Sequence, residues 1–206
     1  MRTISKNLKR IFDIIFSITG MILFIPFIII VSILIKLESK GPVFYRQQRI
    51  GENGKLFTYL KFRTMYVDAD ITLQREYLKE ILSRGKEQPL YKLVDDPKIT
   101  KVGKILRKTS FDELPQFINI FMGDMSIVGP HPLIPYELDI SREIPKERLK
   151  VKPGITGLWQ TSGRGDVTFD DMIKMDIEYI KNQSLLLDLK IMLKTIPIAI
   201  TGKAAY

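Results

Sequence analysis

The sequence predicts an α+β fold that is mostly helical, begins with an apolar membrane helix and contains one small β-hairpin. Ile14 to Ile35 is an uncharged run of 22 residues, long enough for a helix that crosses a bilayer. Residues 43–65 hold two β-type stretches with a glycine-bracketed connection between them. Beyond residue 95, several separate segments carry apolar residues at helical spacing.

Composition excludes several kinds of chemistry. The 206 residues include 32 Lys and Arg, 23 Asp and Glu, one histidine and no cysteine, for a formal net charge of +9. Disulfide scaffolds, Cys-ligated metal sites and thiol nucleophiles are therefore excluded, and the lone His131 excludes motifs such as H-E-x-x-H. Six of the nine net charges fall in residues 1–50, around the apolar run, which favours a membrane over nucleic acid as the partner.

The apolar run has three interpretations. A cleaved signal peptide needs small residues at its cleavage site, whereas residues 34–38 read LIKLE. A straight membrane-spanning helix is the ordinary outcome, but Pro26 near the centre removes a backbone hydrogen bond and predicts a break. Basic residues flank both ends, and basic flanks stay in the cytoplasm, so a re-entrant hairpin broken at Pro26 would satisfy both. The residues alone leave the hairpin and the spanning helix open.

The β-hairpin is expected directly after Gly41-Pro42. The stretch VFYRQQRIG is followed by the connection 51–54, and residues 57–65 alternate with a period of two. One face of this second strand carries Phe57, Tyr59, Lys61 and Arg63.

Helices are expected next, starting with a polar helix over residues 68–86 and a loop after it. Asp95-Asp96-Pro97 predicts the start of another helix, because an acidic cap and a first-turn proline are typical of helix beginnings. Ile99, Val102, Ile105 and Leu106 follow at helical spacing.

The carboxyl half alternates irregular segments with helices. Residues 129–135 and 151–164 are rich in glycine and proline and predict loops. Residues 169–181 predict a helix, and residues 184–195 an amphipathic helix that ends at Pro197. A stripe on this last helix holds Leu186, Leu189 and Leu193.

The segment from Ser110 to Pro115, SFDELP, has both a structural and a functional interpretation. Ser110 and Glu113 have the spacing of a capping box, with a buried apolar stripe expected to follow at Leu114, Phe117, Ile118 and Phe121. A helix amino terminus also binds phosphate, and the carboxylates of Asp112 and Glu113 could hold Mg²⁺ or attack phosphorus. A carboxylate is ionised at neutral pH and needs no partner base.

Basic and glycine-rich segments offer further candidates. Convergent cations would form a diphosphate site, although single cations are usually solvated surface groups. The cations concerned are Arg46, Arg49, Lys61, Arg63, Arg107, Lys108 and Arg164. Glycines in PGITGLWQTSGR allow close approach of the backbone to a ligand, and Trp159 would either stack on a base or lie in the core.

Taken together, these motifs resemble those of the bacterial sugar transferases, also called monotopic phosphoglycosyl transferases. The resemblance covers nearly all of the chain outside about 66–95, with the motifs in family order, in the minimal form without a preceding membrane-helix domain. The motifs are KRIFD (9–13), the proline in the apolar run, GPVFYRQQRIG (41–51), KFRTM (61–65), residues 96–132 around TSFDELPQF, VKPGITGLWQTSGR (151–164) and SLLLDLKIMLKT (184–195).

The resemblance implies transfer of a sugar 1-phosphate from a UDP-sugar to undecaprenyl phosphate, with release of UMP. The family's nucleophile matches Asp112, which would carry a covalent phosphosugar, and its Mg²⁺-assisting acid matches Glu113, so Asp112 and Glu113 are the expected metal residues. Lys61 and Arg107 complete the expected catalytic set. The expected substrate-binding residues are Arg63, His131, Thr156, Gly157, Trp159, Gln160 and Arg164. His131 departs from the arginine common in this motif, which would make phosphate binding weaker or pH-dependent.

The resemblance also implies an architecture: α+β, mostly helical, with a re-entrant membrane helix, a small β-hairpin and interfacial amphipathic helices around the active site. Residues 1–37 would form the proline-broken membrane unit with its basic flank, and residues 38–206 the membrane-associated catalytic domain. The protein would lie on the cytoplasmic face of the bacterial inner membrane with its amino terminus inside. Membrane lipid and downstream glycosyltransferases are the further partners, a homodimer is permitted and nucleic acid is not expected.

Two non-catalytic hypotheses compete with this one. A membrane-anchored module could bind nucleic acid or anionic lipid, but residues 51–206 carry only three of the nine net charges. A structural anchor for a glycan-assembly complex would not need the carboxylates of Asp112 and Glu113 or the nearby cations.

Overall fold

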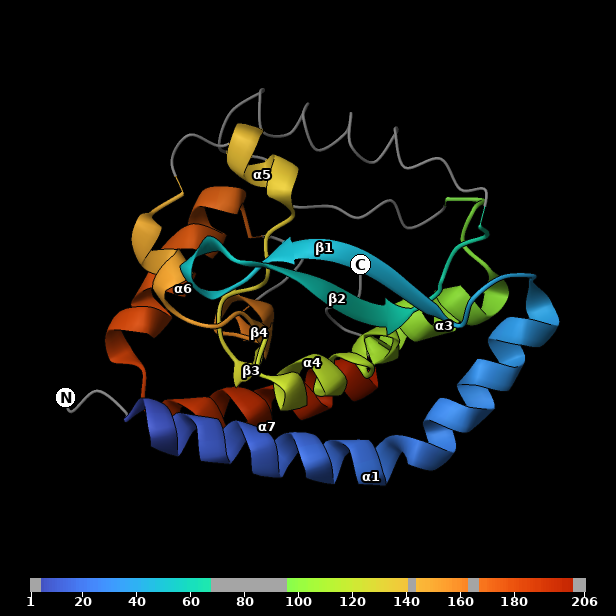
Figure 1. Ribbon diagram of the computed structural model, residues 1–206, viewed down its shortest axis with the longest axis horizontal. Helices are drawn as coiled ribbons and strands as arrows, with labels where there is room; N and C mark the ends of the chain where they lie inside the picture. The colour runs from blue at the N-terminus through green and yellow to red at the C-terminus, as the bar shows by residue number, and fades with distance from the viewer. Residues whose placement is uncertain (1–4, 68–95, 141–143, 163–166, 202–206) are drawn as a thin grey trace.

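The computed structural model describes residues 5–67, 96–140, 144–162 and 167–201 (Figure 1). Helices dominate, and two small two-stranded sheets complete the fold, as the α+β prediction requires. In Figure 1 the first and last helices run along the lower side of the molecule, with the strands above them. The helix predicted over 68–86 and the candidate Arg164 lie outside the described residues.

Helix α1, Lys6–Glu38, contains the whole apolar run and stays helical through Pro26. It bends part-way along its length (Figure 1), as expected where proline removes a hydrogen bond and crowds the preceding turn. Among the described residues it is the one helix long and apolar enough to cross a membrane. The proline therefore produces a bend within a continuous helix, and the membrane faces of the two helix ends remain a prediction.

The hairpin prediction is confirmed. Strand β1, Phe44–Ile50, pairs antiparallel with β2, Leu56–Phe62, and Arg46 lies opposite Leu60. Phe57 and Tyr59, which were predicted to share one face of the strand, are both buried.

Helix α3, Lys101–Thr109, begins later than predicted. Its N-cap is Thr100, whose hydroxyl accepts a hydrogen bond from the Gly103 amide, while Asp96 binds the Lys98 amide in the preceding turn. A hydroxyl one residue before the helix thus satisfies a free amide that the aspartates are too distant to reach.

The predicted capping box at Ser110 does not form. Ser110 has a φ of 57° and ends α3 in the left-handed conformation, with no side-chain cap. A short 3₁₀ turn, η2 (Phe111–Glu113), follows, and α4 is Gln116–Met122. The predicted apolar stripe is also wrong in part, because Ile118 and Phe121 are exposed while the polar Gln116 and Asn119 are buried.

A second sheet includes part of the glycine-rich segment 151–164, which was predicted to be a loop. Strand β3, Ser126–Val128, pairs in parallel with β4, Gly154–Thr156. The backbones of Gly129 and Gly154 approach so closely that a Cβ on Gly154 would lie 2.1 Å from the Gly129 amide nitrogen. Between the strands lie α5, Pro135–Ile140, and the 3₁₀ helix η3, Lys146–Lys150.

The last two helices follow the 3₁₀ turn η4, Trp159–Thr161. Helix α6, Phe169–Asn182, matches its prediction. Helix α7, Leu185–Thr201, does not end at Pro197 but includes it. The leucine stripe on α7 faces outward, since Leu186, Leu189 and Leu193 are all exposed.

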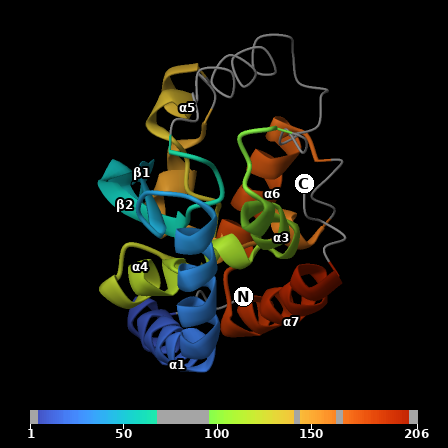
Figure 2. The same cartoon turned by 90° about the vertical axis from the view of Figure 1, so that its right-hand side faces the viewer.

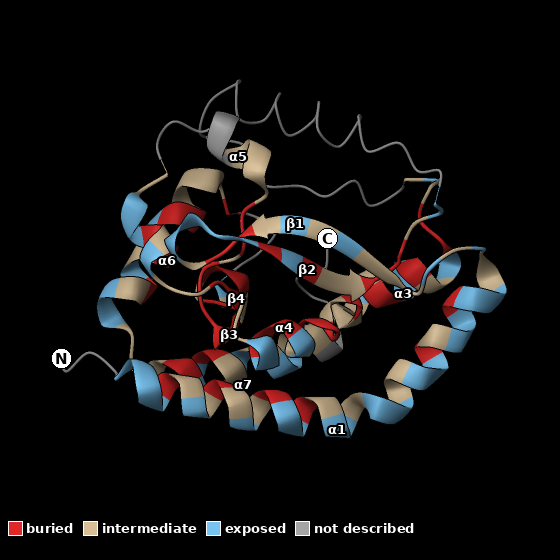
Figure 3. Cartoon of the chain, in the orientation of Figure 1, coloured by how far each residue is buried: buried red, intermediate tan, exposed pale blue. Residues whose placement is uncertain are grey.

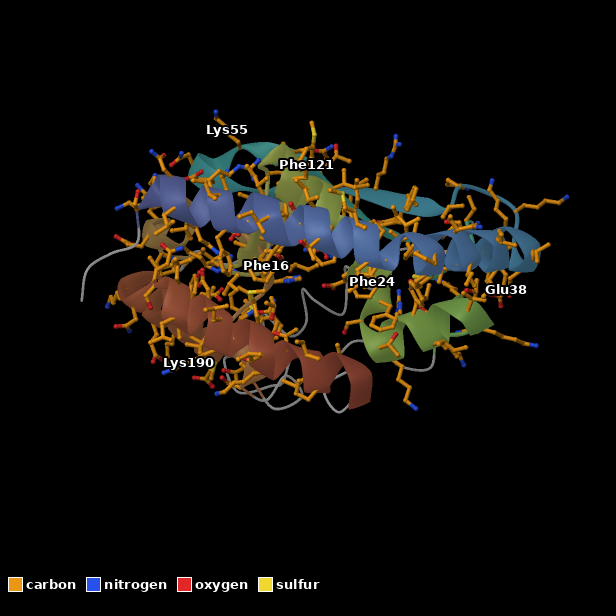
Figure 4. All side chains as sticks on the ribbon, turned by 90° about the horizontal axis from the view of Figure 1, so that it is seen from below. Phe16, Phe24, Glu38, Lys55, Phe121 and Lys190 are labelled. Atoms are coloured by element: carbon orange, nitrogen blue, oxygen red, sulfur yellow. The ribbon has the colours of Figure 1, made fainter. Side chains whose placement is uncertain are left out.

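The chain folds around three buried apolar clusters. One lies under the hairpin between α4, α6 and α7, a second joins the carboxyl end of α1 to Phe62, Leu106 and Leu114, and a third surrounds Trp159. Exposed residues alternate with buried ones along α1 and α7 in Figure 3. The view from below in Figure 4 shows α1 and α7 lying side by side, with α3 close to the carboxyl end of α1. In the turned view of Figure 2 the hairpin and α4 lie on one side of the molecule, and α6 and α7 on the other.

Candidate active site

The candidate nucleophile lies in the tight turn between α3 and α4. Ser110 turns the chain at the end of α3, and the next three residues form η2, which contacts β2. Asp112 is buried, with 5% of its surface exposed, whereas Glu113 is half-buried. The sequence pair is therefore split by the fold into one buried and one more accessible carboxylate.

Arg107 supplies positive charge beside Asp112. Its Nε donates a hydrogen bond to the Thr64 hydroxyl at 3.0 Å. Burial lowers the pKa of the Arg107 guanidinium, and the nearby carboxylates of Asp112 and Asp96 act in the opposite direction. Because arginine stays protonated at neutral pH, the buried carboxylate has a fixed cation as its neighbour.

The two basic residues at the end of the hairpin, Lys61 in β2 and Arg63 just after it, have different surroundings. Lys61 is half-buried on β2, and its ammonium lies 5.4 Å from the centre of the Tyr45 ring. Arg63 is buried and donates to the carbonyls of Lys40 and of Ser39, the latter at 2.9 Å. Arg63 thus binds the chain where α1 ends, and a contact with phosphate stays a prediction for it.

A second group of predicted residues gathers around β4 and η4. The His131 and Trp159 rings meet edge to face at 6.0 Å between centroids. The hydroxyls of Thr156 and Thr195 are 2.7 Å apart, which ties β4 to α7. A Cβ on Gly157 would lie 2.5 Å from the Gly129 carbonyl oxygen, so glycine is required for this close approach of the two backbones.

Two side chains in this group carry buried polar atoms without a hydrogen-bond partner. They are Trp159 Nε1 and Gln160 Oε1, on residues with 4% and 2% of their surface exposed. Unsatisfied buried polar atoms are uncommon in folded proteins and fit a site that binds a polar ligand. Trp159 also packs on Val167, Met172 and Ile173, so its ring belongs to the core as well.

Helix α7 connects the two groups. It contacts α3, which carries Arg107, and also β4 and η4, which carry Thr156 and Trp159. Helix α7 thus contacts elements of both groups, and Arg164 lies outside the described residues.

The loop that holds His131 is fixed by three charged residues, of which Arg148 and Asp176 were not among the predicted site residues. Arg148 donates to the His131 carbonyl at 2.8 Å and forms a buried ion pair with Asp176, with 2.7 Å between Nε and Oδ2. Arg49 donates to the Pro132 carbonyl at 2.8 Å. Charged residues far apart in sequence gave no local signal of this arrangement.

The KRIFD motif has a structural explanation. Arg10 donates to the last carbonyls of α4, those of Ile120 and Phe121, both at 2.6 Å. Asp13 accepts from the Ser126 hydroxyl and the Ile127 amide, which holds β3 against α1. This motif therefore anchors α1 to the rest of the fold.

The carboxylates fit Mg²⁺ only in a site completed by a substrate. Among the described residues no group of three or more His, Asp or Glu side chains could hold a metal ion. Asp112 and Glu113 are adjacent carboxylates, and Mg²⁺ is commonly held by one or two carboxylates together with substrate phosphates and water. Such an ionised carboxylate among cations can attack an electrophilic phosphorus and accept its charge.

Comparison with protein families gives one match, which covers residues 4–202 and is described as bacterial sugar transferase. An exopolysaccharide production protein, ExoY, from Sinorhizobium fredii is 42% identical over all 206 residues, which span 91% of that protein. An undecaprenyl-phosphate galactose phosphotransferase from Salmonella typhimurium is 41% identical over 98% of this chain and 42% of its own length. A UDP-glucose:undecaprenyl-phosphate glucose-1-phosphate transferase from Escherichia coli is 37% identical over the same shares. The chain thus matches nearly the whole of ExoY and less than half of the two larger proteins.

Proposed function

The chain belongs to the bacterial sugar transferase family, and from this premise we propose that it transfers a sugar 1-phosphate from a UDP-sugar to undecaprenyl phosphate. The transfer would release UMP and begin the assembly of an exopolysaccharide, capsule or related glycan. The names of the Salmonella and Escherichia coli relatives support the lipid acceptor, and that of the Sinorhizobium relative supports the pathway. The observation that carries the proposal is the buried Asp112 carboxylate beside Arg107.

In the first half-reaction, the Asp112 carboxylate attacks the sugar-bearing phosphorus of the UDP-sugar. A bond forms between carboxylate oxygen and phosphorus, and the bond from this phosphorus to the bridging oxygen of the diphosphate breaks. UMP leaves with that oxygen, and the sugar 1-phosphate stays on Asp112 as an acyl phosphate. The charge of Arg107 beside Asp112, together with that of Lys61 on β2, would stabilise the negative charge that develops.

In the second half-reaction, a phosphate oxygen of undecaprenyl phosphate attacks the same phosphorus. The bond to Asp112 breaks, the carboxylate is regenerated, and the product is undecaprenyl diphosphate sugar. Because UMP leaves before the lipid phosphate enters, the two anionic substrates never need to share the site. A carboxylate suits both steps, since it is ionised at neutral pH and leaves without a proton.

We further propose that Mg²⁺ is held by Asp112 and Glu113 together with the diphosphate. When bound, it supplies charge neutralisation and Lewis acidity at the phosphoryl oxygens. The half-buried position of Glu113 supports this role, because a carboxylate that reaches solvent can bind a metal that arrives with the substrate.

The group around β4 and η4 is proposed to bind the UDP-sugar. His131, Trp159 and Gln160 present an aromatic edge and two unsatisfied polar atoms, and Thr156 and Gly157 complete this wall. Arg63 and Arg164 would add positive charge around the phosphates. The neutral form of the His131 imidazole provides less charge than an arginine would.

The lipid acceptor places the reaction at a membrane surface. We propose that α1 is re-entrant and lies in the cytoplasmic leaflet of the inner membrane with the amino terminus inside, and that the exposed apolar residues of α4 and α7 lie at the interface. Met122 and Leu193 are 71% and 67% exposed, which supports burial in lipid. Downstream glycosyltransferases would use the lipid-linked product, and a homodimer is compatible with this placement.

The decisive experiment is substitution of the proposed nucleophile. The purified protein is mixed with a panel of UDP-sugars without lipid, and UMP release and the mass of the peptide that contains Asp112 are measured. We expect a single burst of UMP and a peptide heavier by one sugar phosphate. Asp112→Asn should abolish both, whereas Glu178→Gln, on the exposed surface of α6, should leave both unchanged.

Retention of near-normal UMP release by Asp112→Asn would remove Asp112 as the nucleophile. Absence of Mg²⁺-dependent turnover with every UDP-sugar, in protein that still contains its native fold, would instead favour a non-catalytic membrane-anchored module that binds anionic lipid or a glycan-assembly partner.

A further inference from the structure

Glu38, the last residue of α1, caps the helix that leads into the candidate active site. Its two carboxylate oxygens accept hydrogen bonds from the first two amides of α3, with Oε1 2.6 Å from the Lys101 nitrogen and Oε2 2.9 Å from the Val102 nitrogen. A carboxylate in this position also interacts favourably with the amino end of the helix dipole.

The cap is complete. An α-helix begins with four amides that have no partner within the helix. Here Glu38 binds two of them, the Thr100 hydroxyl binds the Gly103 amide at 2.9 Å, and the Thr64 carbonyl binds the Thr100 amide at 3.0 Å. Three different segments of the chain, at residues 38, 64 and 100, therefore fix the start of α3.

The same junction fixes the end of α1. Arg63 donates to the Ser39 carbonyl at 2.9 Å, and its neighbour Thr64 accepts from Arg107 Nε at 3.0 Å. A Cβ on Gly103 would lie 2.1 Å from the Thr64 carbonyl oxygen, so α3 lies directly against this segment. The last turn of α1, the end of β2 and both ends of α3 thus form one connected unit.

Helix α3 is short and carries the catalytic candidates at its far end. Arg107 is in its last turn, Ser110 ends it, and Asp112 follows two residues later. A shift at the Glu38 end would therefore move Arg107 and Asp112 relative to Lys61 on β2. Positioning errors of about 1 Å can reduce an enzymatic rate about 100-fold.

We propose that Glu38 is a positioning residue for Asp112. Through α3, Glu38 transmits the placement of the membrane helix to the active site. The kinetic part of this inference rests on the proposed function, and its structural part does not. Glu38 touches α3 rather than the reacting atoms, so it should affect the rate of transfer more than the binding of the UDP-sugar.

The structural part can be measured without turnover. Because the chain has no cysteine, Lys55→Cys and Lys104→Cys place two spin labels at exposed sites, one on the hairpin connection and one on α3. We expect one narrow distance distribution between the labels in the parent. Glu38→Gln should broaden it, because an amide offers one oxygen acceptor and turns an NH₂ group toward the second α3 amide. Glu178→Gln, an exposed Glu on α6, is the matched control and should leave it narrow.

The kinetic part uses a double-mutant cycle with the capped amide itself. Lys101→Pro removes the amide that Glu38 Oε1 binds, and proline is tolerated here because position 101 is the first of the helix and Thr100 is extended, with ψ of 161°. We expect Glu38→Gln to lower kcat about 10- to 100-fold with little change in KM for the UDP-sugar, and the double variant to lose less than the product of the two single losses.

An unchanged distance distribution together with unchanged kcat in Glu38→Gln would overturn the proposal. It would also be overturned if the loss of kcat in the double variant equalled the product of the losses in Glu38→Gln and Lys101→Pro. A broadened distribution in a protein whose parent shows no turnover would instead leave the positioning role intact and reject the proposed function.

Discussion

Lys9, on the first helix, forms a 2.7 Å ion pair with Asp188 on the last helix, and both side chains are buried. Lys9 also lies 3.2 Å from Asp13, and Asp188 accepts a hydrogen bond from the Tyr179 hydroxyl. One lysine thus serves two buried carboxylates in a network that joins α1, α6 and α7. The pKa of Asp188 is raised, chiefly because burial disfavours its charged form, with Lys9 opposing that effect.

The first prediction follows from the sharing of one buried lysine by two buried carboxylates. Lys9→Met should destabilise the protein by about 3–5 kcal/mol, because it leaves Asp13 and Asp188 buried without their cation. Thermal unfolding in detergent checks this, with Lys6→Met as the control, since the Lys6 side chain is 88% exposed and its ion pair with Glu52 is weak. Equal unfolding temperatures for the two variants would contradict it.

The second prediction concerns the buried Asp176 next to Arg148. Burial raises the pKa of Asp176 from its ordinary value of 3.8 to about 6, with Arg148 opposing the shift. The folded protein therefore holds this proton more tightly than the unfolded chain, and stability should fall as the pH rises between these two values. The difference between these two pKa values corresponds to a loss of at most about 3 kcal/mol in the free energy of unfolding.

The measurement is the free energy of unfolding from pH 4 to 7 for the parent and for Asp176→Asn, whose side chain cannot titrate. The parent should lose stability relative to the variant as the pH rises. A difference that is constant with pH, or that changes in the opposite direction, would contradict the predicted shift.

Local patterns predicted much of this fold. The apolar run, the period of two in the hairpin and the helical spacing of 169–181 each have a local physical cause, and all three elements are present. The predictions that failed required knowledge of distant partners. Parallel pairing of β3 with β4 joins two three-residue strands far apart in sequence, and the glycine-rich segment that holds β4 has no local strand preference.

In the candidate active site, too, local features were predicted and contacts between distant segments were not. SFDELP singled out Asp112 and Glu113, but the sequence could not reveal that Ser110 turns left-handed and ends a helix instead of starting one. Nor did it reveal that Arg63 binds the end of α1, because a basic residue on a strand looks the same whether it meets phosphate or a carbonyl. Contacts such as those of Glu38 with α3 arise only when the chain is folded.

The third prediction concerns His131. An imidazole gains a positive charge between about pH 8 and 5, whereas arginine is charged throughout. In the parent, KM for the UDP-sugar should fall as the pH is lowered over this range, because the ring then attracts the diphosphate. His131→Arg should lower KM at neutral pH and remove this dependence, and initial-rate measurements across pH check both effects. An unchanged pH profile in His131→Arg would place His131 outside the phosphate site.

The fourth prediction concerns the exposed apolar residues of α4 and α7. If they lie in the membrane interface, an environment-sensitive dye on Met122→Cys or Leu193→Cys should shift to shorter emission wavelengths in vesicles and be quenched by nitroxide-labelled lipid. Thr58→Cys is the control, because Thr58 is exposed on the hairpin next to polar Gln48. Equal quenching at all three positions would contradict this placement.

The fifth prediction tests the path of α1. Ser5 precedes the helix and Lys40 follows it, and both are exposed. A re-entrant helix leaves both positions in the cytoplasm, so Ser5→Cys and Lys40→Cys should each resist a membrane-impermeant thiol reagent in intact cells and react after lysis. A helix that crosses the bilayer would instead expose one of the two cysteines outside. Since the parent has no cysteine, any labelling reports only on the introduced residue.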